Sequence, residues 1–147
     1  MSKILGIDPG LRVTGYGVIH QDKQKFTYES SGTIKTTKQD LDLAARIKII
    51  VTGIDEVIEK FSPNIVAIEK VFVNTNPQST LLLGQARGAA IAAIVSKEIN
   101  IYEYTALQIK KSVVGNGHAD KLQVQTMVQR LLKLPSLPGS DLSLIHI

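Results

Sequence analysis

The period of the hydrophobic pattern changes about 40 residues into the chain, and this change restricts the fold more than any other feature. Three short segments before it have the composition of strands: Ile4 to Ile7, Val13 to Ile19 and Phe26 to Ile34. From Asp40 onward, apolar residues recur every three or four positions as far as Phe61, as on one face of a helix. Asp40 is the predicted N-cap, and Pro63 lies just past the end. The pattern predicts an antiparallel meander of three strands followed by a helix.

The rest of the chain alternates between strand and helix patterns. Two further strands are predicted at Ile65 to Ile68 and at Ile99 to Tyr104. The predicted helices run from about Gln78 to Lys97, from Ala106 to Val114, and onward from about Ala119. We therefore expect an α/β fold, in which a five-stranded mixed sheet with three antiparallel strands at its start is flanked by helices packed on its faces.

Length and composition exclude several classes of protein. The chain has 147 residues, with 44% apolar and 20% charged side chains, as in one ordinary globular domain. Because there is no cysteine, disulfide scaffolds, thiolate zinc sites and cysteine nucleophiles are excluded. The longest apolar stretch, Leu81 to Val95, is too short to span a bilayer. We expect a cytoplasmic protein.

Positive charge gathers in the second half of the chain. The net charge is +4. Residues 1–59 carry 8 Lys/Arg and 8 Asp/Glu, whereas residues 60–135 carry 9 and 4. A basic half favours a polyanionic partner such as nucleic acid. A mildly basic surface without a partner explains the same numbers equally well.

Two carboxylates each follow a predicted buried strand. Asp8 comes after Ile4 to Ile7, and Glu69 after Ile65 to Ile68. If these strands are neighbours, both acids emerge at the same edge of the sheet. Two adjacent carboxylates repel each other, and a divalent cation removes that repulsion. Oxygen ligands without cysteine suit Mg²⁺ or Mn²⁺.

A purely structural interpretation of the same acids is that Asp8 starts a tight turn and that Glu69 pairs with Lys70 or Arg12. A third acid is needed to hold two ions, and Asp141 is the only candidate after the last predicted helix. Two ions held in this way suit in-line cleavage of a phosphodiester. The three histidines form no metal set and are expected at the surface: His20, His118 and His146.

Five segments of the chain resemble the RuvC-type Holliday-junction resolvases. They are Gly6 to Gly10, Arg12 to Gly17, Ala67 to Phe72, Leu83 to Gly88 and Lys110 to Gly115. The match is collinear from about Lys3 to Leu137. The resemblance implies an RNase H-like fold, a homodimer, and two Mg²⁺ ions per active site. It also implies paired symmetric nicking of four-way DNA junctions in recombination and repair, in partnership with a branch-migration helicase.

The resemblance also implies roles for single residues. Asp8, Glu69 and Asp141 match the catalytic, metal-binding acids. Phe72 matches an aromatic residue that stacks on bases, although a core phenylalanine fits the local pattern too. The matching basic residues and their basic neighbours are the candidates for contact with DNA: Lys110, Lys111, Lys121 and Arg12. Solvated surface lysines are the alternative interpretation.

Two further features bear on assembly and on the C-terminus. Gly84, Gly88 and Ala92 form a small-residue face, which suits close approach by another helix, either of this chain or of a second subunit. The family has an acid where this chain has Leu144, and a final helix follows there. We interpret residues 1–141 as one nuclease domain without its final helix and residues 142–147 as an artificial tail. We expect a truncated chain of this kind to bind junctions weakly and to cut them poorly.

Two other functions fit parts of the pattern. An Asp-x-Gly segment after a first strand, as at Asp8 to Gly10, also occurs in ATPases of the actin-like and sugar-kinase group, which need two such halves. A non-catalytic junction-binding module on the same fold is the other alternative. Binding of ATP would support the first, and an Asp8→Asn variant that changes nothing would support the second.

Overall fold

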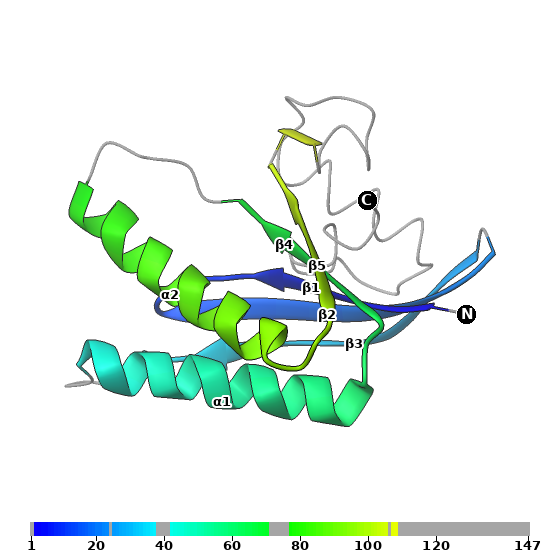
Figure 1. Ribbon diagram of the computed structural model, residues 1–147, viewed down its shortest axis with the longest axis horizontal. Coiled ribbons are helices and arrows are strands. Elements are labelled where there is room, and N and C mark those ends of the chain that lie inside the picture. Colours follow the sequence, from blue (N-terminus) through cyan, green and yellow to red (C-terminus); the bar gives the residue numbers. More distant parts are fainter. Residues whose placement is uncertain (1, 24, 38–41, 71–76, 106, 109–147) are drawn as a thin grey trace.

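A mixed sheet of five strands forms the centre of the molecule (Figure 1). The computed structural model describes residues 2–23, 25–37, 42–70, 77–105 and 107–108. The strands are β1 (Ser2–Asp8), β2 (Val13–Asp22), β3 (Lys25–Lys35), β4 (Ile65–Glu69) and β5 (Asn100–Tyr104). They lie in the order β3-β2-β1-β4-β5, with β1, β2 and β3 antiparallel and β4 and β5 parallel to β1. The expected five-stranded mixed sheet is confirmed.

The first helix, α1 (Leu43–Phe61), starts later than the sequence pattern predicted. Its N-cap is Asp42, whose side chain accepts a hydrogen bond of 2.8 Å from the Ala45 N–H. The prediction of Asp40 as the cap is therefore wrong, because periodicity alone cannot choose between two aspartates two positions apart. The helix ends as expected before Pro63, with Ser62 in the left-handed conformation at φ 49°.

The apolar face of α1 is also rotated from the one that the periodicity predicts, which runs through Ala44, Ile47, Val51, Ile54, Ile58 and Phe61. The buried side chains are Ile50, Ile54, Val57, Ile58 and Phe61. Ala44, predicted to lie on this face, is exposed. Gly53 lets the helix pack closely on β3, since a Cβ there would lie 2.8 Å from the Ile34 side chain.

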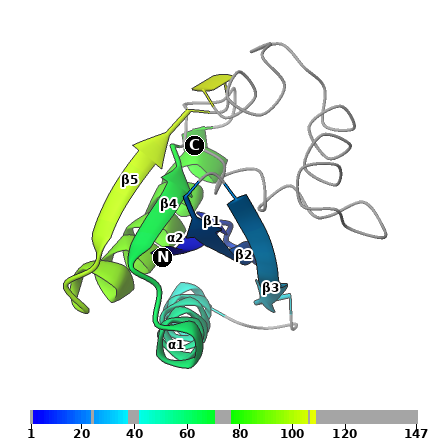
Figure 2. The same cartoon turned by 90° about the vertical axis from the view of Figure 1, so that its right-hand side faces the viewer.

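The second helix, α2 (Pro77–Val95), lies beside α1 on the same face of the sheet (Figures 1 and 2). One core joins the two helices to the sheet, and its fully buried members include Leu5, Val18, Val66, Ile50, Ile54 and Ile94. The helix predicted at 106–114 is described only at residues 107–108, which are helical, and the helix predicted from 119 lies outside the described residues. Among the described helices, none is long and apolar enough to cross a membrane.

Candidate active site

Asp8 and Glu69 lie at the carboxyl ends of two neighbouring parallel strands. β1 pairs with β4 in a register that joins Ile4 to Ile65 and Ile7 to Ile68. Asp8 follows Ile7 in β1, and Glu69 follows Ile68 in β4. Adjacent strands are about 4.8 Å apart, so the two acids start side by side. The expectation that they share one edge of the sheet is confirmed.

Both acids project from the sheet face opposite the two helices. Leu5 and Ile7 of β1 and Val66 and Ile68 of β4 are packed into the core beneath α1 and α2. Because side chains alternate along a strand, the residues that follow Ile7 and Ile68 point to the other face. Asp8 and Glu69 are both partly exposed there. The arrangement gives two carboxylates a common side of the sheet and access to solvent.

The turn after Asp8 is tightly built. A Cβ on Gly10 would lie 2.2 Å from the Val13 carbonyl oxygen, so the turn accepts only glycine at this position. The Gly10 N–H donates to Thr14 Oγ1 at 3.3 Å, and that hydroxyl donates to the Gly10 carbonyl at 3.0 Å. Thr14 is buried, with 1% of its surface exposed. These bonds fix the direction in which the chain leaves Asp8.

Arg12 lies in the same turn and is exposed. Its main-chain carbonyl accepts a 2.8 Å hydrogen bond from the Thr36 N–H, which joins the turn to the residue that follows β3. The Thr36 carbonyl in turn accepts a 2.7 Å bond from Arg46 Nη1 of α1. Arg12, which the sequence predicts to contact DNA, therefore lies four residues after Asp8 in a turn whose backbone is fixed by hydrogen bonds.

Arg87 of α2 supports the end of β4, a role that was not predicted from the sequence. Its Nε donates to the main-chain carbonyl of Glu69 at 3.2 Å. Its Nη2 lies 3.1 Å from Glu103 Oε1 of β5, an ion pair whose angles are not those of a hydrogen bond. The signal that could have found it is its isolation, because Arg87 is the only ionic residue in α2.

The described residues contain two of the three predicted acids. Among them, no group of three or more His, Asp or Glu side chains gathers in one place. Five other predicted site residues lie outside the described residues: Phe72, Lys110, Lys111, Lys121 and Asp141. Residues 142–147, Leu144 among them, also lie outside the described residues. Two oxygen donors on adjacent strands fit part of the shell of a hard divalent cation. The site geometry is thus compatible with a metal shared by Asp8 and Glu69.

Comparison with known proteins agrees with this geometry over nearly the whole chain. The family model for crossover junction endodeoxyribonuclease RuvC matches residues 4–143. The chain is 63% identical over 139 residues to the RuvC of Janthinobacterium sp. (strain Marseille), covering 95% of this chain and 76% of that relative. It is 62% identical over 143 residues to the RuvC of Methylobacillus flagellatus, covering 95% of this chain and 79% of that relative.

A solved structure gives the same answer for the fold. Thermus thermophilus RuvC in complex with Holliday junction substrate superimposes with a TM-score of 0.91 at 28% identity, covering 99% of this chain and 92% of that chain. The fold is therefore RNase H-like, as the resemblance implied. With the family model matching most of the chain, this protein belongs to the crossover junction endodeoxyribonuclease RuvC family.

Proposed function

We propose that this chain is a structure-selective endodeoxyribonuclease that resolves four-way DNA junctions by paired symmetric nicks during recombination and repair. The observation that carries the proposal is the placing of Asp8 and Glu69 side by side at the carboxyl edge of β1 and β4. Family membership and the likeness to a RuvC bound to a Holliday junction substrate support the choice of DNA as substrate. The role of the two acids as the centre of the site is part of the proposal.

The acids would hold divalent metal, as befits a family of divalent-metal-dependent nucleases. We propose Mg²⁺, with Mn²⁺ as a substitute, and two ions per site once Asp141 joins Asp8 and Glu69. Such ions, when bound, activate water and stabilise the leaving oxygen. The contribution of the chain is to hold both carboxylates on one face, on rigid strands, with a fixed turn after Asp8. Preorganisation of this kind lowers the cost of assembling the site.

We propose DNA contacts at one basic residue close to Asp8 in the sequence and at others in the basic half of the chain. Arg12 is exposed four residues after Asp8, which suits a phosphate close to the scissile bond. We propose Lys110, Lys111 and Lys121 as further phosphate contacts and Phe72 as a stacking residue. The basic excess in residues 60–135 supports this, because phosphate contacts supply most of the affinity that is independent of sequence.

A homodimer is proposed from the outward face of α2. Leu81 and Val95 there are 64% and 57% exposed. Gly84 and Gly88 lie between them, and a Cβ on either would meet no atom within 4 Å. A row of apolar and small residues on the outside of a helix suits a second copy of the chain. We also propose a cytoplasmic location and partnership with a branch-migration helicase, both from the family alone.

The direct test is cleavage of a labelled synthetic four-way junction with Mg²⁺ and with chelator, against a linear duplex of the same sequence. It would be run with this chain and with the same chain carrying a family C-terminal helix. Symmetric nicks that need metal and the junction are expected from the chain that carries the helix, and much weaker cutting from this chain. Tight junction binding without cutting by either protein would favour the non-catalytic binding module instead.

The variant Asp8→Asn separates the nuclease from the module. A nuclease variant of this kind loses cutting and keeps junction binding, whereas a pure binder is unchanged. Calorimetry with ATP on the same preparation tests the ATPase alternative, which binding of ATP would support. No observation on the described residues favours that alternative.

A further inference from the structure

Arg87 is the single charged residue in α2, and its position is not explained by solubility. Only 18% of its side chain is exposed. Burying a guanidinium among apolar neighbours is costly unless it gains specific partners. Its partners come from two different strands, the Glu69 carbonyl of β4 and the Glu103 carboxylate of β5. Both lie at the carboxyl edge that carries the candidate site.

The Glu69 carbonyl needs a donor from outside the sheet. The Lys70 N–H donates to the Tyr104 carbonyl of β5 at 2.8 Å. In a trans peptide the carbonyl of Glu69 points the opposite way, toward β1. Continuing the β1–β4 register by one step sets Asp8 opposite Glu69, and in a parallel ladder this carbonyl would take the N–H of the next β1 residue. That residue is Pro9, which has no N–H.

Arg87 Nε takes the place of this missing donor. It reaches the Glu69 carbonyl at 3.2 Å from α2, while Nη2 pairs with Glu103 at 3.1 Å. The end of β4 is thus attached to the helix beneath it and to β5 beside it. Arg87 therefore adds a hydrogen bond at the main-chain carbonyl of the last residue of β4. That last residue is Glu69 itself.

We propose that Arg87 is a positioning residue for the metal site, which sets the place of the Glu69 carboxylate relative to Asp8 by binding the Glu69 main chain. The inference rests on the proposed function, in which Glu69 is a metal ligand. Arg87 touches neither DNA nor metal in this role. A lysine cannot replace it, because only the guanidinium fork serves the carbonyl and the carboxylate together.

The experiment measures Mn²⁺ affinity of the purified full chain from the free-Mn²⁺ signal in electron paramagnetic resonance. Neither DNA nor catalytic activity is needed. The variants are Arg87→Lys, Arg87→Gln and Glu103→Gln, and the last keeps the fold accessible because the Glu103 side chain is 42% exposed. Supporting partners of metal ligands change affinity by about 10- to 100-fold. We expect a loss in that range for both Arg87 variants and a smaller loss in the same direction for Glu103→Gln.

Two control variants separate positioning from plain stability. Ile94→Val shortens a fully buried side chain of α2 and lowers thermal stability without removing a hydrogen bond or an ion pair. Lys97→Gln removes the exposed 3.9 Å ion pair with Asp55, in which neither Arg87 nor Glu103 takes part. Both are expected to bind Mn²⁺ as the wild type does. If Ile94→Val weakens Mn²⁺ binding as much as Arg87→Gln does, the positioning role is wrong.

A rescue tests the ladder argument directly. Pro9→Ala returns an N–H to the position opposite the Glu69 carbonyl. In the double variant Pro9→Ala/Arg87→Gln, we expect part of the lost Mn²⁺ affinity to return, measured as a coupling in a double-mutant cycle. Additive effects of the two changes would contradict the claim that Arg87 replaces the missing donor.

The same measurement distinguishes this inference from the proposed function. Glu69→Gln tests the metal site itself. If Glu69→Gln binds Mn²⁺ normally, the proposed metal site fails, and the role of Arg87 fails with it. If Glu69→Gln loses Mn²⁺ while Arg87→Gln and Glu103→Gln keep it, the metal site stands and only the positioning role is overturned.

Discussion

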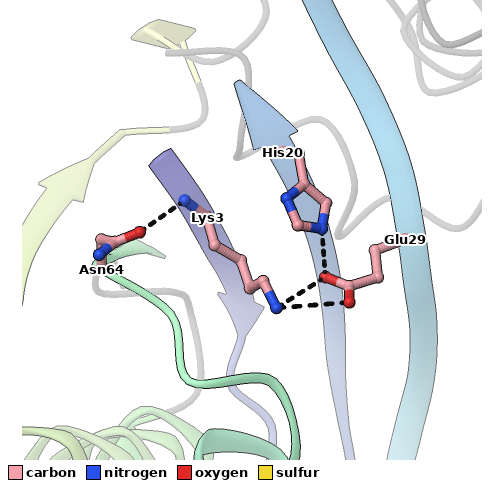
Figure 3. Close-up of polar contacts among 4 residues, drawn as sticks. All are labelled: Lys3, His20, Glu29 and Asn64. Atoms are coloured by element: carbon pink, nitrogen blue, oxygen red, sulfur yellow. Dashed lines mark hydrogen bonds and ion pairs between the residues drawn. The ribbon is translucent and has the colours of Figure 1, made fainter. Parts of the chain in front are cut away.

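The two ends of the central sheet treat charge in opposite ways. At the amino end of β1, Glu29 joins two basic side chains (Figure 3). Its carboxylate lies 3.3 Å from Lys3 Nζ and 2.9 Å from His20 Nε2. At the carboxyl end of β1, two side chains of like charge, Asp8 and Glu69, stand on adjacent strands. One end is arranged to neutralise a carboxylate from within the chain, and the other is arranged to present a pair of them.

The backbone at the two ends follows the same division. Glu29 lies in a β-bulge, where Val18 pairs with Ser30 and Ile19 with Tyr28, so one extra residue is turned toward its partners. Asn64 is bound to the main chain of Lys3 at the amino end. The Lys3 N–H donates to Asn64 Oδ1, and the Asn64 N–H donates to the Lys3 carbonyl, both at 2.8 Å. The amino end thus pairs its charges within the chain, whereas the carboxyl end places two like charges on adjacent strands.

The sharpest test of this comparison applies one substitution at both ends. Glu69→Gln is expected to lower junction cleavage by at least about 1,000-fold, equivalent to about 4 kcal/mol in the barrier. Glu29→Gln is expected to leave the cleavage rate unchanged, because its contacts are at the far end of the sheet. Single-turnover cleavage of a labelled junction measures both. Equal losses in the two variants would remove the distinction between the ends.

The tight turn at the carboxyl end gives the next largest effect. Gly10→Ala places a methyl group 2.2 Å from the Val13 carbonyl, where the backbone must shift. We expect a loss of about 2–3 kcal/mol in the free energy of unfolding, within the range for overpacking. Urea denaturation measures it. Lys97→Gln, which removes only an exposed 3.9 Å ion pair with Asp55, serves as the control and should change the free energy of unfolding little.

Added metal should stabilise only through the carboxyl end. At ten times its dissociation constant, Mg²⁺ raises the free energy of unfolding by about 1.4 kcal/mol. Thermal melts with and without Mg²⁺ should show a shift for the wild type and for Glu29→Gln but none for Glu69→Gln. A shift that persists in Glu69→Gln would place the binding of metal elsewhere.

The smallest effect is expected at the amino end. The side chains of Lys3, His20 and Glu29 are 23–29% exposed, so solvent screens their attraction. Glu29→Gln should therefore cost no more than about 1 kcal/mol in the free energy of unfolding, and less at high salt. Urea denaturation at low and high ionic strength measures it. A cost that salt does not change would mean that packing at the bulge matters more than charge.

Local pattern by itself determined much of this protein. The positions of the five strands, the helix that ends before Pro63, and the choice of Asp8 and Glu69 as paired candidates all follow from periodicity and from the residues after each apolar run. These features can be predicted because each depends on residues that are close together in the sequence. The site residues outside the described ranges, Asp141 and Phe72 among them, remain predictions.

Which distant groups meet depends on how the elements pack in three dimensions. The insertion of β4 beside β1 brings Asp8 to Glu69, and no local signal fixes that register. Arg87 reaches a carbonyl 18 residues away, and His20, expected at the surface, is partly buried against Glu29. The phase of α1 was set by packing on β3, which local periodicity does not encode. Contacts of this kind are fixed by how the sheet and helices pack together, because each depends on two segments that the chain brings together only on folding.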